Sequence, residues 1–228
     1  MNRVGIIGGL GPASTLDYYS GIINGYRMRA NDGNYPEIVI NSVNMAQVLS
    51  YVTNKEWDSL EKLLLDAISD LANAGAEFAA IASNTPHIVF DRVQQESVLP
   101  LNSIVDATCA CIQQKGCRKV VVIGTRFTMS SGLYSNALEK YGITAIVPSE
   151  AEQLAIHDII FPKLEDGIVV PEDKGKMLAI ADSLLINNSA DGLVLGCTEL
   201  PLMIKGCDLD RLIFNTTQIH IESIVRSI

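Results

Sequence analysis

The sequence lacks a hydrophobic run long enough to cross a membrane. Apolar stretches stop well short of the roughly 18 residues that a span needs. Residues 1–9 are too short and too rich in glycine to form the apolar core of a signal peptide. The cysteines number five, an odd count that argues against the disulfide framework of a secreted protein. We therefore expect free thiols, a cytoplasmic location and no membrane partner.

Basic residues are also scarce. Lys and Arg total 17 against 26 Asp and Glu, which gives a formal net charge of −9. Nucleic acids and anionic membranes bind through basic patches, so we expect neither as a partner. The three histidines stand far apart, and no Cys or His spacing resembles a metal site. A small anionic substrate is still allowed, because backbone amides and hydroxyl groups can bind it.

Short apolar runs rich in β-branched residues alternate with longer helical patterns. Most of these runs lack in-and-out alternation, as expected for parallel strands that are covered on both faces. Apolar residues make up 48% of the chain, which is typical of a globular protein. The sequence therefore predicts an α/β fold with parallel sheets. The predicted strands are 4–7, 38–40, 78–82, 120–123, 144–147, 193–195 and 212–214.

The two halves of the chain resemble each other. The strand opening at residues 3–8 is similar to the one at 119–124, and the segment 75–85 is similar to 189–199. We infer two similar α/β domains related by a pseudo-two-fold. The first would comprise residues 1–101 plus 211–228 and the second residues 102–210. The alternative, that all βα units look alike, does not explain why both the strand openings and the polar turns repeat.

A glycine-rich segment, Gly8–Pro12, follows the first strand of the first half, and its counterpart in the second half, Gly124–Met129, offers the hydroxyls of Thr125 and Thr128. Ligands of open α/β sheets bind at the carboxyl ends of strands, so we expect a site in a cleft between the two domains. Glycines let the backbone approach an anion, but their spacing here matches neither a dinucleotide fingerprint nor a P-loop. A small carboxylate fits better, and a tight turn without a ligand is the alternative.

Polar residues follow another strand of each half, at Ser83–His87 and Gly196–Pro201. Polar groups directly after a buried strand need partners, and a ligand is one. The motif favours a structural role for His87, with orientation of a neighbour as the alternative. Cys197 ends a strand and precedes a helix, a position that lowers the pKa of a thiol. Because the repeat places Cys197 opposite Ser83, we predict that Cys197 is catalytic.

Together these four motifs resemble those of the aspartate/glutamate racemase family. The similarity covers essentially the whole chain, and the motifs occur in the family's order. The resemblance implies two α/β domains with the active site between them, no cofactor, an amino-acid substrate and often a homodimer. It also implies a two-base reaction. One residue removes the α-proton and a second, usually also a cysteine, returns a proton from the other face.

In this pattern Cys197 takes the second-domain role, and Ser83 occupies the position where the family usually has cysteine. One interpretation is that Ser83 relays a proton through His87 or water in a slow or one-directional racemase. In another, Cys197 acts alone in a decarboxylase or isomerase, and in a third the serine is an engineered replacement. An amino-acid-binding protein with impaired catalysis is a further alternative. The residues assigned to the α-carboxylate and amine are Gly9, Leu10, Asn84, Thr85, Thr125, Thr198 and Glu199.

A partner for the substrate side chain is harder to find. Racemases of the family often carry a polar or basic residue after the second strand, where this chain has Gln47 and Tyr51. These residues can form hydrogen bonds but cannot neutralise a carboxylate. The first basic residue of the segment is Lys55, and Lys163 is a further candidate. We predict aspartate, glutamate or a close analogue as the substrate, with a neutral or sulfonated analogue as the alternative.

Overall fold

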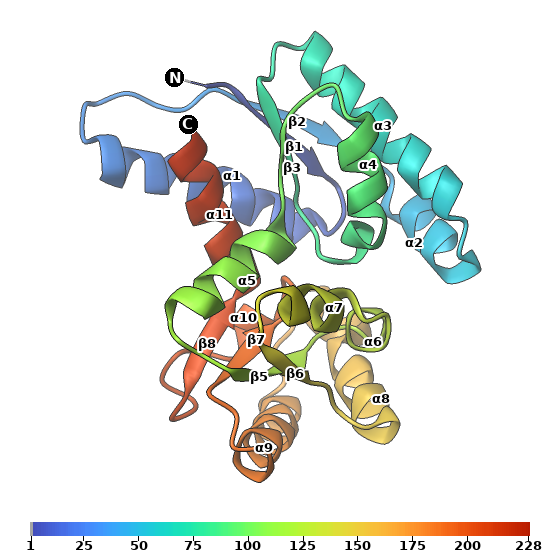
Figure 1. Cartoon of the computed structure of the whole chain (residues 1–228), viewed down its shortest axis with the longest axis vertical. Coiled ribbons are helices and arrows are strands. Elements are labelled where there is room, and N and C mark those ends of the chain that lie inside the picture. The colour runs from blue at the N-terminus through green and yellow to red at the C-terminus, as the bar shows by residue number, and fades with distance from the viewer. Residues whose placement is uncertain (1) are drawn as a thin grey trace. The chain divides into compact units, whose positions relative to one another are not determined.

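The computed structural model describes residues 2–228 and divides into two units, each built on a four-stranded parallel sheet (Figure 1). Unit 1 contains the chain up to Ala107 together with Thr217–Ile228, and unit 2 contains Thr108–Thr216. The predicted α/β fold with two similar parallel-sheet halves is confirmed. No helix within residues 2–228 is long and apolar enough to cross a membrane.

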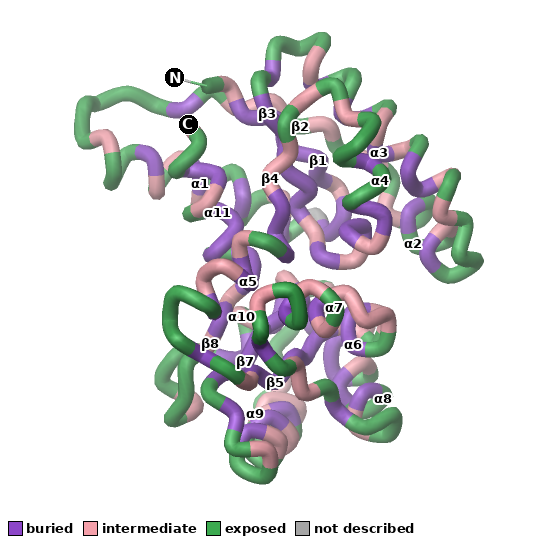
Figure 2. The backbone as a smooth tube through the Cα atoms, viewed as in Figure 1, coloured by how far each residue is buried: buried purple, intermediate pink, exposed green. Residues whose placement is uncertain are grey.

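The sheet of unit 1 has the strand order β2-β1-β3-β4. Its central strands, β1 and β3, are buried at every position because helices cover both faces of the sheet (Figure 2). The edge strand β2 is only partly buried. The strands are β1 (Val4–Gly8), β2 (Ile38–Ser42), β3 (Phe78–Ile81) and β4 (Leu101–Asn102). The helices are α1 (Pro12–Ala30), α2 (Met45–Asn54), α3 (Trp57–Asn73), the 3₁₀ turn η1 (Thr85–Val89) and α4 (Phe90–Glu96).

The sheet of unit 2 has the equivalent order, β6-β5-β7-β8. Here too the third strand in chain order is fully buried beside the first. The strands are β5 (Lys119–Ile123), β6 (Thr144–Ile146), β7 (Gly192–Leu195) and β8 (Leu212–Asn215). Its helices are α5 (Ile104–Gln114), α6 (Arg126–Ser130), α7 (Leu133–Lys140), α8 (Glu150–Ile159), the π-turn η2 (Ile160–Leu164), α9 (Pro171–Asn187) and α10 (Leu200–Met203). The last helix of the chain, α11 (Thr216–Ser227), lies largely in unit 1.

The placement of β8 corrects one prediction. Residues 211–228 were expected to return to the first half as a strand and a helix. Instead β8 pairs in parallel with β7 in the second sheet, where Gly192 faces Leu212. Only the helix α11 returns to unit 1. The very short strand β4, which pairs with β3, was not predicted because two residues carry no periodicity.

Each sheet is completed by a helix that follows the fourth strand of the other sheet. α5 follows β4 and lies largely in unit 2, whereas α11 follows β8 and lies largely in unit 1. In unit 1 the Tyr18 hydroxyl of α1 lies 2.7 Å from Nδ1 of His220 in α11. Gly21 permits this packing, because a Cβ there would lie 2.8 Å from the Ile221 side chain. The equivalent tyrosine of unit 2, Tyr134, is likewise buried and hydrogen-bonded to Thr108 of α5.

Candidate active site

In unit 1 the glycine-rich loop after β1 lies beside the polar turn after β3. The two strands are hydrogen-bonded neighbours, so their carboxyl ends meet at one edge of the sheet. The Ala82 N–H donates to the Ile7 carbonyl at 3.0 Å, and the Ser14 hydroxyl donates to the Ala82 carbonyl at 3.1 Å. The structure therefore brings together the candidate residues of the first half, which are Gly9, Leu10, Ser83, Asn84 and Thr85.

Gly9 occupies a position where a side chain is excluded. Its φ angle is +75°, and a Cβ atom would lie 2.3 Å from the Val43 carbonyl oxygen at the end of β2. Its N–H donates to the Thr15 hydroxyl at 2.9 Å. The glycine is thus required by the close approach of two backbone segments, and its amide already has a partner. The adjacent Leu10 side chain is buried.

The His87 imidazole is buried beneath the Ser83 turn and is bonded on both sides. Its Nδ1 lies 2.9 Å from the Ser83 carbonyl oxygen, and its Nε2 lies 3.3 Å from the Ile104 backbone nitrogen. A carbonyl only accepts and an N–H only donates, so Nδ1 carries the proton and Nε2 accepts. Burial, together with the nearby His220, lowers the pKa of His87 to about 3.

This geometry removes one interpretation of the Ser83 position. A neutral imidazole with both nitrogens engaged cannot take a proton from the Ser83 hydroxyl, so a relay through His87 is not supported. The prediction that His87 is structural agrees with its contacts. Asn84 is buried beside it, and Ser83 and Thr85 are half-buried.

In unit 2 the ends of β5 and β7 meet in the same way. The Gly196 N–H donates to the Ile123 carbonyl at 2.7 Å, and a Cβ at Gly124 would lie 2.9 Å from the Gly196 carbonyl oxygen. Thr125 caps α6, because its hydroxyl accepts from the Thr128 N–H at 3.3 Å. The turn that bears Thr125 and the turn that bears Cys197 are therefore packed together.

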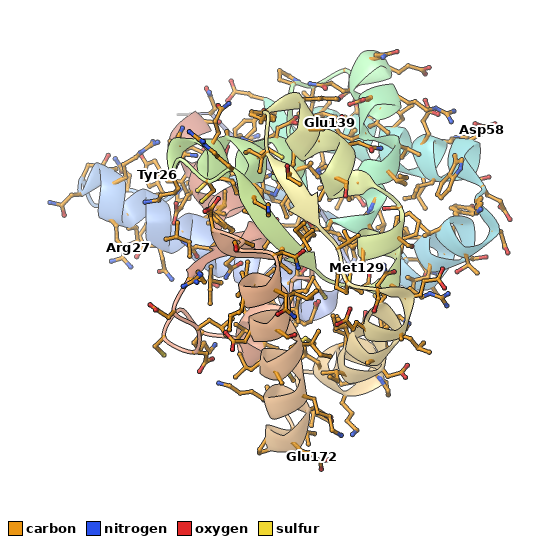
Figure 3. The ribbon with its side chains drawn as sticks, turned by 60° about the horizontal axis from the view of Figure 1, so that its bottom comes forward. Tyr26, Arg27, Asp58, Met129, Glu139 and Glu172 are labelled. Atoms are coloured by element: carbon orange, nitrogen blue, oxygen red, sulfur yellow. The ribbon has the colours of Figure 1, made fainter. Side chains whose placement is uncertain are left out.

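Cys197 is buried and forms a compact polar group with the two residues that follow it. The thiol donates to Oε2 of Glu199 at 3.0 Å, and the Thr198 hydroxyl donates to the same oxygen at 2.7 Å. On its apolar side Cys197 belongs to the core cluster that contains Met129 of α6 (labelled in Figure 3). The Cys197 sulfur thus lies between a hydrocarbon core and a carboxylate.

The expected depression of the Cys197 pKa is wrong. Burial raises the pKa of this thiol well above its usual value, and the charge of Glu199 raises it further. The helix that follows, α10, has only four residues and starts three positions later. Its dipole does not offset the loss of solvent and the adjacent negative charge. The resting thiol is therefore protonated and is hydrogen-bonded to a base.

A second acid of this site, Glu165, was missed by the sequence analysis. It follows η2, and burial raises its pKa to about 7, with the charges of Glu199 and Asp166 as further causes. Glu165 also acts electrostatically on Cys197. No local sequence pattern marks Glu165 as a site residue. With a pKa of about 7, Glu165 is partly protonated near neutral pH.

Three of the four candidate partners for the substrate side chain, Gln47, Tyr51 and Lys163, are already paired. Gln47 donates to the Tyr51 hydroxyl at 2.7 Å beside a hollow of about 410 Å³ between β2, α2 and α3. Lys163 forms an ion pair with Asp173 at 3.4 Å, and Lys55 is exposed at the end of α2. Among residues 2–228, no cluster of three or more His, Cys, Asp or Glu side chains is placed to hold a metal ion.

Comparison with known proteins gives matches over both units. The family profile described as "Asp/Glu/Hydantoin racemase" matches residues 7–224. The broad specificity amino-acid racemase RacX of Bacillus subtilis (strain 168) is 28% identical over 204 residues, which cover 86% of this chain and 85% of that protein.

Solved structures agree with these matches. The crystal structure of an aspartate racemase homologue from Pyrococcus horikoshii OT3 superposes with a TM-score of 0.88 at 36% identity, covering 100% of this chain and 99% of that one. The aspartate racemase of Picrophilus torridus shares the fold, with a TM-score of 0.77 at 21% identity and coverage of 100% and 94%.

Proposed function

We propose that this chain, which belongs to the Asp/Glu/hydantoin racemase family as its motifs predicted, racemises aspartate, glutamate or a close analogue at Cα. The observation that carries the proposal is the Cys197–Glu199 pair, in which a buried thiol is hydrogen-bonded to a carboxylate at 3.0 Å. Such a pair supplies both a proton donor and a site that can take the proton back. In this proposal the reaction needs no cofactor.

Cys197 takes part in both directions of the proposed reaction. As an acid, its protonated thiol delivers its proton to one face of the α-carbanion, and the sulfur becomes a thiolate. As a base, the thiol first passes its proton to Glu199, and the resulting thiolate then removes the α-proton. Glu165 completes the group, because with a pKa of about 7 it exchanges protons with solvent near neutral pH.

Ser83 is proposed to act on the opposite face of Cα. Its hydroxyl is a much weaker acid than a thiol, and His87 cannot activate it. We therefore expect slow inversion and faster exchange at the face served by Cys197. The α-carboxylate and amine stay assigned to Gly9, Leu10, Asn84, Thr85, Thr125, Thr198 and Glu199, of which Glu199 also accepts the Cys197 proton and Gly9 already donates its N–H to Thr15.

The substrate range is proposed to extend beyond the acidic amino acids. Gln47 and Tyr51 are uncharged and bonded to each other, and Lys163 is held by Asp173. None of these three offers a free cation for a distal carboxylate, and the fourth candidate, Lys55, lies exposed at the end of α2. The similar protein RacX is named a broad specificity amino-acid racemase, which supports including neutral side chains. A homodimer and a cytoplasmic location stay predictions.

The test is exchange of the α-proton in D₂O, measured by mass spectrometry and chiral chromatography. Each enantiomer of aspartate, glutamate and a panel of neutral amino acids is incubated separately with the protein. We expect deuterium at Cα from at least one enantiomer, with slower appearance of the other enantiomer. The absence of exchange from every amino acid tried would reject the racemase.

A single-thiol decarboxylase or isomerase is the second candidate. It is favoured by a difference between the two halves. The Cys197 thiol is hydrogen-bonded to the Glu199 carboxylate, whereas the His87 ring binds the Ser83 carbonyl and not its hydroxyl. A protonated thiol suits the quenching of a carbanion left by loss of carbon dioxide. Gas release from a substituted malonate, or turnover of maleate, without α-proton exchange in amino acids would favour this candidate.

A further inference from the structure

We propose that His87 is a positioning residue that fixes the backbone at Ser83 and thereby sets the reach of the Ser83 hydroxyl toward the substrate. The inference rests on the proposed function in one respect, namely that Ser83 takes part in the reaction. His87 itself does not touch the reacting atoms in this proposal. It acts through the main chain of the residue that does.

The contacts of His87 fix the ring in three ways. Nδ1–H donates to the Ser83 carbonyl at 2.9 Å, and Nε2 accepts from the Ile104 N–H at 3.3 Å. The ring also stacks on Phe90, with centroids 4.9 Å apart and planes 9° apart. A buried imidazole held at both nitrogens and on one face has a single tautomer and a single orientation. The Ser83 carbonyl is therefore held by a rigid donor.

A second imidazole ties the same group to the rest of unit 1. His220 meets His87 edge-on, with ring centroids 6.4 Å apart. Its Nε2 lies 3.0 Å from the Asn102 carbonyl oxygen, and its Nδ1 lies 2.7 Å from the Tyr18 hydroxyl. His87 and His220 therefore hold the Ile104 amide and the Asn102 carbonyl, on either side of the β4–α5 junction. The Ser83 turn is thus linked to the segment through which the chain leaves unit 1.

Unit 2 shows that the fold alone does not require this imidazole. The repeat that aligns Ser83 with Cys197 aligns His87 with Pro201, which has neither an N–H nor a polar side chain. The turn after β7 nevertheless forms, with the Leu200 N–H donating to the Cys197 carbonyl at 3.3 Å. The same strand and turn thus fold with proline at this position. We therefore assign the hydrogen bonds of His87 to a role of the Ser83 turn and not to the formation of the fold.

Two substitutions separate the two hydrogen bonds of His87. In His87→Asn the amide nitrogen takes the place of Nδ1, so the donor to the Ser83 carbonyl is kept and the acceptor for Ile104 is lost. In His87→Gln the amide oxygen takes the place of Nε2, so the acceptor is kept and the donor to Ser83 is lost. Each variant loses one buried hydrogen bond, so we expect similar losses of thermal stability. The matched histidine control is His157→Gln in unit 2, because Nδ1 of His157 has no hydrogen-bond partner among the described residues.

The readout compares inversion with exchange that retains configuration, starting from the enantiomer that exchanges faster. We expect His87→Gln to slow inversion by about 10- to 100-fold, because a displacement of about 1 Å has an effect of that order. Retention exchange at the Cys197 face should stay within about threefold of the wild type, since that half is untouched. His87→Asn should slow inversion by about threefold at most, because it keeps the bond to Ser83.

Other results overturn the proposal. Equal inversion rates in the Asn and Gln variants would show that the bond to Ser83 does not matter. A parallel loss of inversion and of retention exchange in His87→Gln would show a merely structural role. If Ser83→Ala inverts as fast as the wild type, the positioning role falls while the racemase stands. If the wild type exchanges no α-proton, the proposed function fails and the positioning role falls with it.

Discussion

Unit 1 and unit 2 have equivalent strand orders, yet the turn after the third strand carries a serine hydroxyl in unit 1 and a thiol bonded to a carboxylate in unit 2. In each unit the third strand donates to the end of the first, through Ala82 to Ile7 and through Gly196 to Ile123. After that shared turn, unit 1 has Ser83 over a neutral histidine, and unit 2 has a thiol bonded to a carboxylate. The repeated scaffold therefore supplies two similar turns. The side chains on each turn decide whether an acid–base pair forms there, as it does between Cys197 and Glu199.

The difference also concerns how each turn is held. His87 binds the Ser83 backbone and not its hydroxyl, whereas Glu199 binds the Cys197 side chain itself. In the proposed reaction, unit 1 thus positions a hydroxyl group and unit 2 transfers protons. Mutations that exchange or remove these features test whether the division is real.

The largest effect is expected from removing the thiol. Cys197→Ala should lower α-proton exchange from both enantiomers by at least about 10³-fold, because the same sulfur atom is the acid as a thiol and the base as a thiolate. Deuterium incorporation at Cα measures it. Cys207→Ala is the matched control, since Cys207 is an exposed free thiol of the same unit and should leave exchange intact. Residual exchange in Cys197→Ala close to the wild-type rate would assign catalysis to another group.

Giving unit 1 a thiol should make the two halves alike. Ser83→Cys replaces a very weak acid by a group whose usual pKa is about 8.5, so we expect inversion to rise by about 10- to 100-fold. The rates of inversion from both enantiomers, followed by chiral chromatography, measure the change. Ser20→Cys places a thiol on the exposed surface of α1 and should change nothing. An unchanged inversion rate in Ser83→Cys would mean that the unit 1 group does not limit the reaction.

The sequence predicts much of the scaffold because the scaffold is local. Buried parallel strands such as β1 and β7 are continuous apolar runs, and the repeat of their polar turns is readable without a structure. Pairing partners are not readable in this way. The run at β8 is equally apolar whichever sheet it joins, so its return to the first half was predicted wrongly.

The chemistry of the site is less local, and the sequence predicts less of it. Cys197 was found from its motif, but its thiol pKa depends on burial and on Glu199, so the local rule about helix starts gave the wrong direction. Glu165 lies 32 residues before Cys197 in the chain, and only folding brings its charge close enough to act on the thiol. The ring nitrogens of His87 find partners 4 and 17 residues away, which no spacing rule joins.

The buried histidines of unit 1 should make its stability depend on pH. Burial holds the pKa values of His87 and His220 at about 3 and about 4, below the value of about 6.5 in an unfolded chain. As the pH falls below 6.5, the two histidines bind protons in the unfolded state but stay neutral in the folded state. The free energy of unfolding of unit 1 therefore decreases. Trp57, the single tryptophan, starts α3 in unit 1 and reports its unfolding by fluorescence. The urea midpoint should fall between pH 7 and pH 4.5, and His87→Gln should flatten that fall. A midpoint that is independent of pH in this range would contradict the buried neutral imidazoles.

The smallest effect, and the one that completes the comparison, is expected at Glu165. Its folded pKa of about 7 lies above the usual 4.5, so between these two values the folded state holds a proton that the unfolded state has released. The contribution of Glu165 to the stability of unit 2 is therefore largest below pH 4.5 and is lost as the pH rises to 7. Glu165→Gln removes the titration, so it should stabilise the protein at pH 8 relative to the wild type more than it does at pH 4.5. Amide hydrogen exchange of β5 and β7 measures this in unit 2, and Glu150→Gln, an exposed acid of α8, is the control. If Glu165→Gln gives the same change at both pH values, the carboxyl group is solvated and cannot hold the proton near Cys197. The second half would then depend on the Cys197–Glu199 bond alone for its acid–base chemistry.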